Sequence, residues 1–264
     1  DDLIDSTHRV LALRKALGSQ EQPFYAHTPM ILAPDKSKLS KRHGAVSLES
    51  YKEAGYLPEA IVNYLVLLGW SPKDDREIVT MDEMIKEFDI YDVNKSGAVF
   101  DIKKLEWMNG EYIRAVQTTE LIERLQPEAH FLFGDVDQEI FAKAVELAQP
   151  RATTTKSMVE QMSALFDNPF PLNEDAKTQL KDSQDTQVVL SAIKSHLETC
   201  EWNVESIDLR ETVNELGLKP RKALPLVYLA VQGSTTGLPL FDVIHLLGRE
   251  ETLKRLDEAL GVIS

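Results

Sequence analysis

The sequence predicts a mainly α-helical protein, and three observations lead to that fold class. Apolar residues recur at the helical period of 3.6 residues over many segments. Residues that start or stop helices bound these segments, and only short apolar runs such as 29–33 suggest strands. After Gln117 the composition shifts further toward helix formers, so we expect a stack of short helices there and not a sheet.

In the first part of the chain, capping residues place the helices. We expect a helix over residues 6–17, one that begins after the N-cap Ser47 and stops at Gly55, and one from Pro58 to Gly69. Thr80 and Glu83 form a capping-box pattern that starts a further helix. An extended piece near residue 98 then leads to the last helix of this part, which carries Leu105, Trp107 and Met108.

The same patterns predict which side chains are buried. Ile61, Leu65 and Leu68 are expected to face inward from one helix. Trp70 and Trp107 are expected to belong to the core, because aromatic residues on helices mostly supply buried area.

In the second part, prolines divide the helical pattern. Pro150, Pro169 and Pro171 break it, which indicates a linker near residues 167–173. The periodic segments predict helices over residues 140–148, 158–166, 188–197, 204–216 and 250–260.

Composition limits the class of protein. With 264 residues, 43% of them hydrophobic, the chain is long enough for two or three soluble domains. The net charge of −14 argues against a general nucleic-acid binder, so any RNA contact must be local. The single cysteine, Cys200, fits a reducing compartment such as the cytoplasm, and no apolar run approaches the ~20 residues of a membrane span.

A short cationic loop stands out in this acidic chain. Lys36, Lys38, Lys41 and Arg42 surround the hydroxyl of Ser40. Ammonium and guanidinium groups at this density suit a polyphosphate ligand, although a solvated surface loop has the same composition.

The loop, Lys-Leu-Ser-Lys-Arg at residues 38–42, resembles the second signature loop of class I aminoacyl-tRNA synthetases. Its surroundings resemble bacterial glutamyl-tRNA synthetases, in the same order along the chain. The matching segments are residues 23–27, 29–32, 57–60, 63–65, 68–71, 100–101, 104–105, 107–110 and 112–114, with looser matches at 246–250 and 254–256. Glutaminyl-tRNA synthetases share the loop but carry a β-barrel anticodon domain, and glutamyl-queuosine enzymes lack an anticodon region.

The resemblance implies a role in adenylate formation, in which ATP and glutamate react before transfer to tRNA. Lys41 matches the lysine that contacts ATP, and Lys38, Ser40 and Arg42 complete the motif. Asp2 matches an acidic position that touches ATP, and Ile31 an apolar position that contacts the adenine. The alternatives are a fraying terminus for Asp2 and a buried strand residue for Ile31.

For the tRNA, Arg151 resembles the family arginine that reads the last anticodon base, and arginine can donate two parallel hydrogen bonds to a base edge. The alternative is a surface arginine before a helix. Tyr228 stands where the family commonly has a second anticodon-reading arginine, which leaves recognition of the first base open. Lys103, Lys104 and Arg114 are candidates for contact with the tRNA stem, or belong to a solvated face.

The resemblance also implies the organisation. We expect residues 1–117 to be the end of a catalytic domain with a stem-contact region, and residues 118–172 and 173–264 to be two helical anticodon-binding subdomains. The implied ligands are ATP with Mg²⁺, L-glutamate and tRNA-Glu, and we expect a monomer.

The family's His-x-Gly-His signature and its glutamate-binding residues have no counterpart here. This chain alone is therefore expected to be inactive in ATP–pyrophosphate exchange, and clear exchange activity would contradict that reading. Two alternatives stay open: a stand-alone tRNA-binding module without chemistry, and an acidic helical interaction protein.

Overall fold

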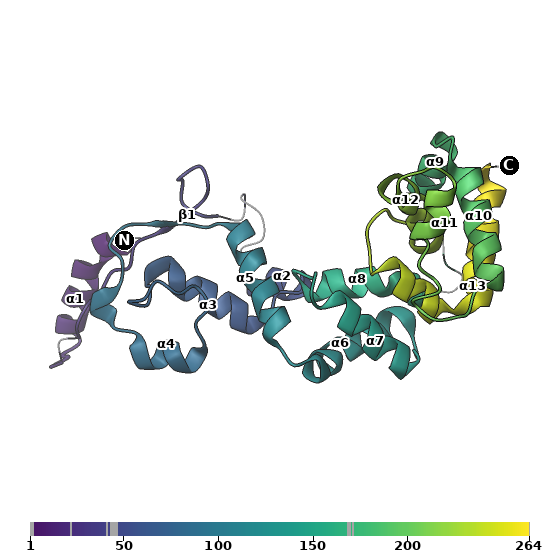
Figure 1. Ribbon diagram of the computed structural model, residues 1–264. Helices are drawn as coiled ribbons and strands as arrows, with labels where there is room; N and C mark the ends of the chain where they lie inside the picture. Colours follow the sequence, from purple (N-terminus) through teal and green to yellow (C-terminus); the bar gives the residue numbers. More distant parts are fainter. Residues whose placement is uncertain are drawn as a thin grey trace. The chain divides into compact units, whose positions relative to one another are not determined.

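A computed structural model describes residues 3–21, 23–40, 42, 47–167, 170 and 172–263. Helices make up most of this part of the chain, which confirms the mainly α fold class (Figure 1). The chain divides into two compact units. Unit 1 comprises residues 1–115 and 153–156, and unit 2 comprises residues 116–152 and 157–264. The division of the second half at residues 172 and 173 stays a prediction.

Unit 1 combines five helices with two short strands in the described residues. The helices are α1 (Thr7–Ala16), α2 (Leu48–Glu53), α3 (Pro58–Gly69), α4 (Met81–Glu87) and α5 (Ile102–Ala115). The strands are β1 (Ile31–Leu32) and β2 (Ala98–Val99), which pair in parallel. Single 3₁₀ turns lie at Ile4–Ser6 and Ile90–Asp92.

The predicted starts of α2, α3 and α4 are confirmed, whereas Ser6, predicted with Thr7 as a possible cap of α1, makes no capping side-chain hydrogen bond. The Ser47 side chain accepts a hydrogen bond from the Ser50 N–H at the start of α2, and Pro58 occupies the first turn of α3. At the start of α4, Thr80 and Glu83 form the reciprocal pair of a capping box. The carboxylate accepts from the Thr80 N–H at 2.8 Å and from its hydroxyl, and both bonds lower the pKa of Glu83.

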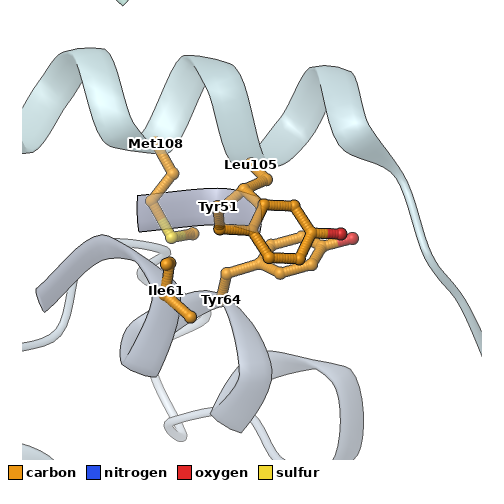
Figure 2. Close-up of a cluster of buried hydrophobic side chains, with 5 residues drawn as sticks. All are labelled: Tyr51, Ile61, Tyr64, Leu105 and Met108. Atoms are coloured by element: carbon orange, nitrogen blue, oxygen red, sulfur yellow. The ribbon is translucent and has the colours of Figure 1, made fainter. Parts of the chain in front are cut away.

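The core of unit 1 lies between α3 and α5. Figure 2 shows five buried side chains there, Tyr51, Ile61, Tyr64, Leu105 and Met108. Burial raises the pKa of Tyr64 to about 12, and its hydroxyl accepts a hydrogen bond from the Asp101 N–H at 2.6 Å. This bond joins the start of α5 to α3.

Some burial predictions for unit 1 are wrong. Leu65 is 43% exposed, because the stripe of α3 that meets α5 runs through Ile61 and Tyr64 and leaves Leu65 at its margin. Trp107 is 42% exposed, whereas Trp70 is buried as expected. The apolar residues of α1 are exposed in the described structure.

The regular elements in the described residues of unit 2 are all helices. Its helices are α6 (Thr118–Phe133), α7 (Gln138–Ala148), α8 (Thr155–Phe166), α9 (Glu174–Asp182), α10 (Thr186–Thr199), α11 (Arg210–Glu215), α12 (Pro220–Gln232) and α13 (Leu240–Ile263). The first two residues of α8 belong to unit 1. Helix α6 packs on α7, while α10, α12 and α13 pack on one another with α9 and α11 beside them. No helix in the described part of the chain combines the length and apolar character that a membrane span requires.

Two helix boundaries in unit 2 differ from the prediction. The helix expected over residues 204–216 is reduced to α11, because side chains before it bond to nearby backbone: Asn203 accepts from the Ser206 N–H and Asp208 from the Arg210 N–H. The final helix, expected over residues 250–260, forms part of the longer α13, which is interrupted at Gly248 (φ 80°, ψ 165°). The linker predicted at 167–173 includes residues 168, 169 and 171, which lie outside the described part.

A buried arginine holds several elements of unit 2 together. Arg255 on α13 is 3% exposed. Its guanidinium donates to the carbonyl oxygens of Ala164 (2.6 Å) and Val231 (2.8 Å) and to the Glu251 carboxylate (2.8 Å). It also lies 4.1 Å from the centre of the Phe170 ring. The end of α8 and the end of α12 are thus bonded to one side chain of α13.

Candidate nucleotide and nucleic-acid contact residues

The cationic loop begins as a tight hairpin after β1. The Ala33 N–H donates to the Ser37 carbonyl at 2.8 Å, and the Lys36 N–H donates back to Ala33 at 2.8 Å. Beyond the turn, the Leu39 N–H donates to the Ile31 carbonyl at 3.0 Å. These bonds fix the path of residues 31–39, because two of them close the turn and the third joins its two arms.

Asp35 shapes the tip of this hairpin. One carboxylate oxygen accepts from the Ser37 N–H at 2.9 Å and from its hydroxyl at 2.7 Å. Lys36 next to it has φ +64°, a left-handed conformation that residues other than glycine seldom adopt. The sequence predicted a cationic loop here, but neither the local role of the Asp35 carboxylate nor the unusual backbone of Lys36 was foreseen.

The base of the hairpin is held by β2. Ile31 pairs with Ala98 and Leu32 with Val99. A Cβ at Gly97 would lie 2.8 Å from the Met30 carbonyl oxygen, so this approach requires glycine. The short strand predicted at residues 29–33 is therefore confirmed as the support of the loop.

The candidate nucleotide contacts fall on this hairpin and just after it. Ile31 is 37% exposed at the base, which does not match the alternative of a buried strand residue. Lys38 is exposed, Ser40 is half-buried and Arg42 is exposed. Two further candidates, Lys41 and Asp2, lie outside the described residues. The structure thus brings Ile31, Lys38 and Ser40 together on one hairpin.

The candidate anticodon reader, Arg151, follows the end of α7. Its side chain is exposed, while its neighbours Gln149 and Ala152 are buried. The Gln149 amide accepts from the Thr118 hydroxyl and donates to the Val116 carbonyl, both at 2.8 Å. The N–H groups of Arg151 and Ala152 both donate to the Ala148 carbonyl at 3.1 Å. An exposed guanidinium on a well-fixed backbone can donate two parallel hydrogen bonds to a base.

Tyr228 lies half-buried in the middle of α12. Three cations that the sequence analysis did not single out, Lys219, Arg221 and Lys222, lie at the beginning of the same helix. Lys222 pairs with Asp185 at 2.6 Å. Their clustering in an acidic chain was the signal that could have drawn attention to them.

The candidate stem contacts all lie on α5. Lys104 pairs with Glu77 at 2.6 Å and Arg114 with Glu111 at 2.7 Å, and Lys103 is exposed. Exposed pairs of this kind contribute little to stability. Lys104 and Arg114 could therefore exchange their carboxylate partner for a tRNA phosphate at a small cost in free energy.

Comparisons with known proteins agree with the two-part organisation. The family described as "tRNA synthetases class I (E and Q), catalytic domain" matches residues 1–107. The family described as "Anticodon binding domain" matches residues 120–260, more than half of the chain.

Similar proteins cover nearly the whole chain. The glutamate–tRNA ligase of Thermobifida fusca is 40% identical over 98% of this chain and 56% of its own length. That of Syntrophotalea carbinolica is 39% identical over 99% of this chain and 56% of its own length. Among solved structures, a glutamate tRNA ligase from Elizabethkingia meningosepticum in complex with its amino acid superposes with a TM-score of 0.79 at 30% identity, covering 100% of this chain and 56% of that one.

A class I synthetase catalytic portion joined to a helical anticodon-binding domain defines a class I aminoacyl-tRNA synthetase. Within that class, the chain belongs to the glutamyl-tRNA synthetase family. It spans about half the length of the curated relatives that it matches, which fits a C-terminal portion.

Proposed function

We propose that this chain supplies the loop that closes over ATP, together with the tRNA contacts, of a glutamate–tRNA ligase. Such an enzyme joins glutamate to AMP and then transfers it to the 3′-terminal adenosine of tRNA-Glu. The observation that carries the proposal is the order of two features along the chain. A cationic hairpin lies in the part that matches the class I catalytic domain, and the part after it matches an anticodon-binding domain. We further propose that the protein acts in the cytoplasm as a monomer.

In this proposal, the cations of residues 38–42 stabilise negative charge. When glutamate attacks the α-phosphate, charge grows on the pyrophosphate that leaves. Lys38, Lys41 and Arg42 would lower the energy of that state by donating to the phosphate oxygens, and Ser40 would add a hydroxyl donor. The task is electrostatic and positional, so none of these residues needs to transfer a proton.

The remaining nucleotide contacts are proposed on the same basis. Ile31 would contact the adenine from the base of the hairpin, and Asp2 would touch ATP. The family implies Mg²⁺, but the described residues offer no group of three or more His, Cys, Asp or Glu side chains placed to hold a metal ion. We therefore assign no protein ligand to Mg²⁺.

For the tRNA, we propose that Arg151 reads the last anticodon base and that Tyr228 stacks on the first one. Lys103, Lys104 and Arg114 would contact stem phosphates. Removing the guanidinium of Arg151 removes a base contact, so the loss should depend on which base is present.

Arg151→Ala tests the tRNA assignment. We expect it to weaken binding of a glutamate tRNA transcript by about 1–3 kcal/mol, and to have little effect on a transcript whose last anticodon base is replaced. Filter binding or fluorescence anisotropy with both transcripts measures this.

Arg124→Ala is the matched control, because Arg124 is another exposed arginine of unit 2 and its guanidinium lies 2.6 Å from the Glu120 carboxylate on the same helix. It should leave both affinities unchanged. Equal weakening of both transcripts by Arg151→Ala would indicate a plain phosphate contact and contradict base reading.

A second candidate function is a tRNA-binding module without chemistry of its own. The observation that favours it is the match to an anticodon-binding domain over residues 120–260, since such a domain can bind tRNA without catalytic residues. Both candidates predict tRNA binding and no ATP–pyrophosphate exchange by the isolated chain. They differ in whether exchange appears when the chain is combined with a polypeptide that carries the His-x-Gly-His signature.

A further inference from the structure

Residues 153–156 are a short stretch of unit 1 enclosed in the sequence of unit 2. The stretch begins two residues after Arg151 and contains the first two residues of α8. Two of its backbone groups need partners from elsewhere. The Thr153 carbonyl lies before the helix, and the Thr155 N–H is among the first N–H groups of a helix, which have no partner within it. Two residues of unit 1, Asn109 and Gly55, supply them.

Asn109 on α5 is fully buried and uses both ends of its amide. Its Oδ1 accepts from the Leu57 N–H at 2.7 Å, and its Nδ2 donates to the Thr153 carbonyl at 2.6 Å. The Leu57 N–H requires an acceptor and the Thr153 carbonyl a donor, so the orientation of the amide is determined. Asn109 therefore fixes the backbone at the first residue of the stretch.

Gly55 fixes the stretch at Thr155, two residues after Thr153. Its carbonyl oxygen accepts from the Thr155 N–H at 2.9 Å and from the Thr155 hydroxyl at 3.2 Å. Gly55 has φ +83°, and a Cβ there would lie 2.4 Å from the Lys156 nitrogen. Only glycine allows this approach, so the start of α8 is bonded to a site shaped to receive it.

We propose that Asn109 and Gly55 are positioning residues for anticodon discrimination, acting on Arg151 through the backbone of residues 152–155. This inference rests on the proposed role of Arg151. On one side, the Arg151 N–H donates to Ala148 at the end of α7. On the other, Ala152 is buried and Thr153 is bonded to Asn109. Reading a base requires donors placed to a fraction of an ångström, so releasing one of these two attachments weakens selectivity more than general RNA affinity.

The test measures selectivity, defined as the ratio of affinities for the glutamate tRNA transcript and the transcript with its last anticodon base replaced. Asn109→Asp keeps the acceptor for Leu57 but removes the donor to Thr153. We expect selectivity to fall roughly three- to tenfold, the range typical of indirect coupling, with the affinity for the altered transcript unchanged. Thr155→Val, a milder isosteric change that removes only the hydroxyl bond to Gly55, should lower selectivity in the same direction.

Asn63→Asp is the matched control. Asn63 is also fully buried in unit 1, and its Oδ1 lies 2.9 Å from the Val79 N and 2.9 Å from the Tyr112 hydroxyl. Neither of these bonds involves residues 153–156, so the substitution of Asn63 should lower the melting temperature without changing selectivity. Amide hydrogen exchange at Thr155 reports directly whether the attachment has opened in each variant.

Wild-type selectivity in both Thr155→Val and a folded Asn109→Asp would overturn the inference; if Asn109→Asp does not fold, Thr155→Val alone decides. A loss of selectivity in Asn63→Asp equal to that in Asn109→Asp would also overturn it. If Arg151→Ala itself leaves selectivity intact, the proposed role of Arg151 fails. If Arg151→Ala abolishes selectivity while the positioning variants do not, only the inference fails.

Discussion

Replacing Arg255 by methionine is expected to lower the free energy of unfolding of unit 2 by about 3–4 kcal/mol. Methionine fills similar space but donates no hydrogen bond. The carbonyl oxygens of Ala164 and Val231 would lose a donor, and the Glu251 carboxylate would lose a close cation. Burial lowers the pKa of Arg255, yet the guanidinium stays protonated, so the structure depends on its charge at all ordinary pH values.

Lys254→Met separates this effect from the loss of any positive charge on α13. Lys254 is the next residue, its side chain is 53% exposed, and its ammonium lies 3.6 Å from the same Glu251 carboxylate. Surface pairs contribute only about 0–1 kcal/mol, so this variant should unfold almost like the wild type. Hydrogen exchange of α12 and α13 amides measures both variants, and equal protection in the two would contradict the assigned role of Arg255.

Arg255 also illustrates what the sequence could not reveal. Its apolar neighbours follow the helical period, so the helix itself was predictable, but an arginine within that pattern is more often on the surface. Asn109 is the same case on α5, where a polar side chain lies on the buried face while Trp107 is 42% exposed. Hydrophobic periodicity ranks residues by apolar character, and it overlooks polar residues that are buried because they satisfy backbone groups.

Local signals predicted much more. The caps at Ser47, Pro58 and Thr80 were correct because each depends on a few adjacent residues. For the candidate nucleotide site, the sequence predicted the cations and the strand before them. It could not predict that Asp35 would close the turn and that Lys36 would adopt a positive φ, since both depend on the three-dimensional path between β1 and Leu39.

Replacing Gly55 by alanine is expected to destabilise unit 1 by about 3 kcal/mol, through two separate costs. The first is backbone strain, because an L-residue at φ +83° is disfavoured by about 1–2 kcal/mol. The second is steric, because the new Cβ would lie 2.4 Å from the Lys156 nitrogen and 2.8 Å from the Thr155 hydroxyl oxygen. The clash is with backbone, so the start of α8 must move away and its bonds to the Gly55 carbonyl must lengthen.

Gly18→Ala isolates the first cost from the second. Gly18 also belongs to unit 1 and has φ +76°, but a Cβ there would meet nothing within 4 Å. This variant should therefore lower the free energy of unfolding by only about 1–2 kcal/mol, the conformational part. The two losses can be compared by urea denaturation, with hydrogen exchange at Thr155 as the local reporter. If Gly55→Ala were no more destabilising than Gly18→Ala and left Thr155 protected, residues 153–156 would not be held against Gly55 in solution.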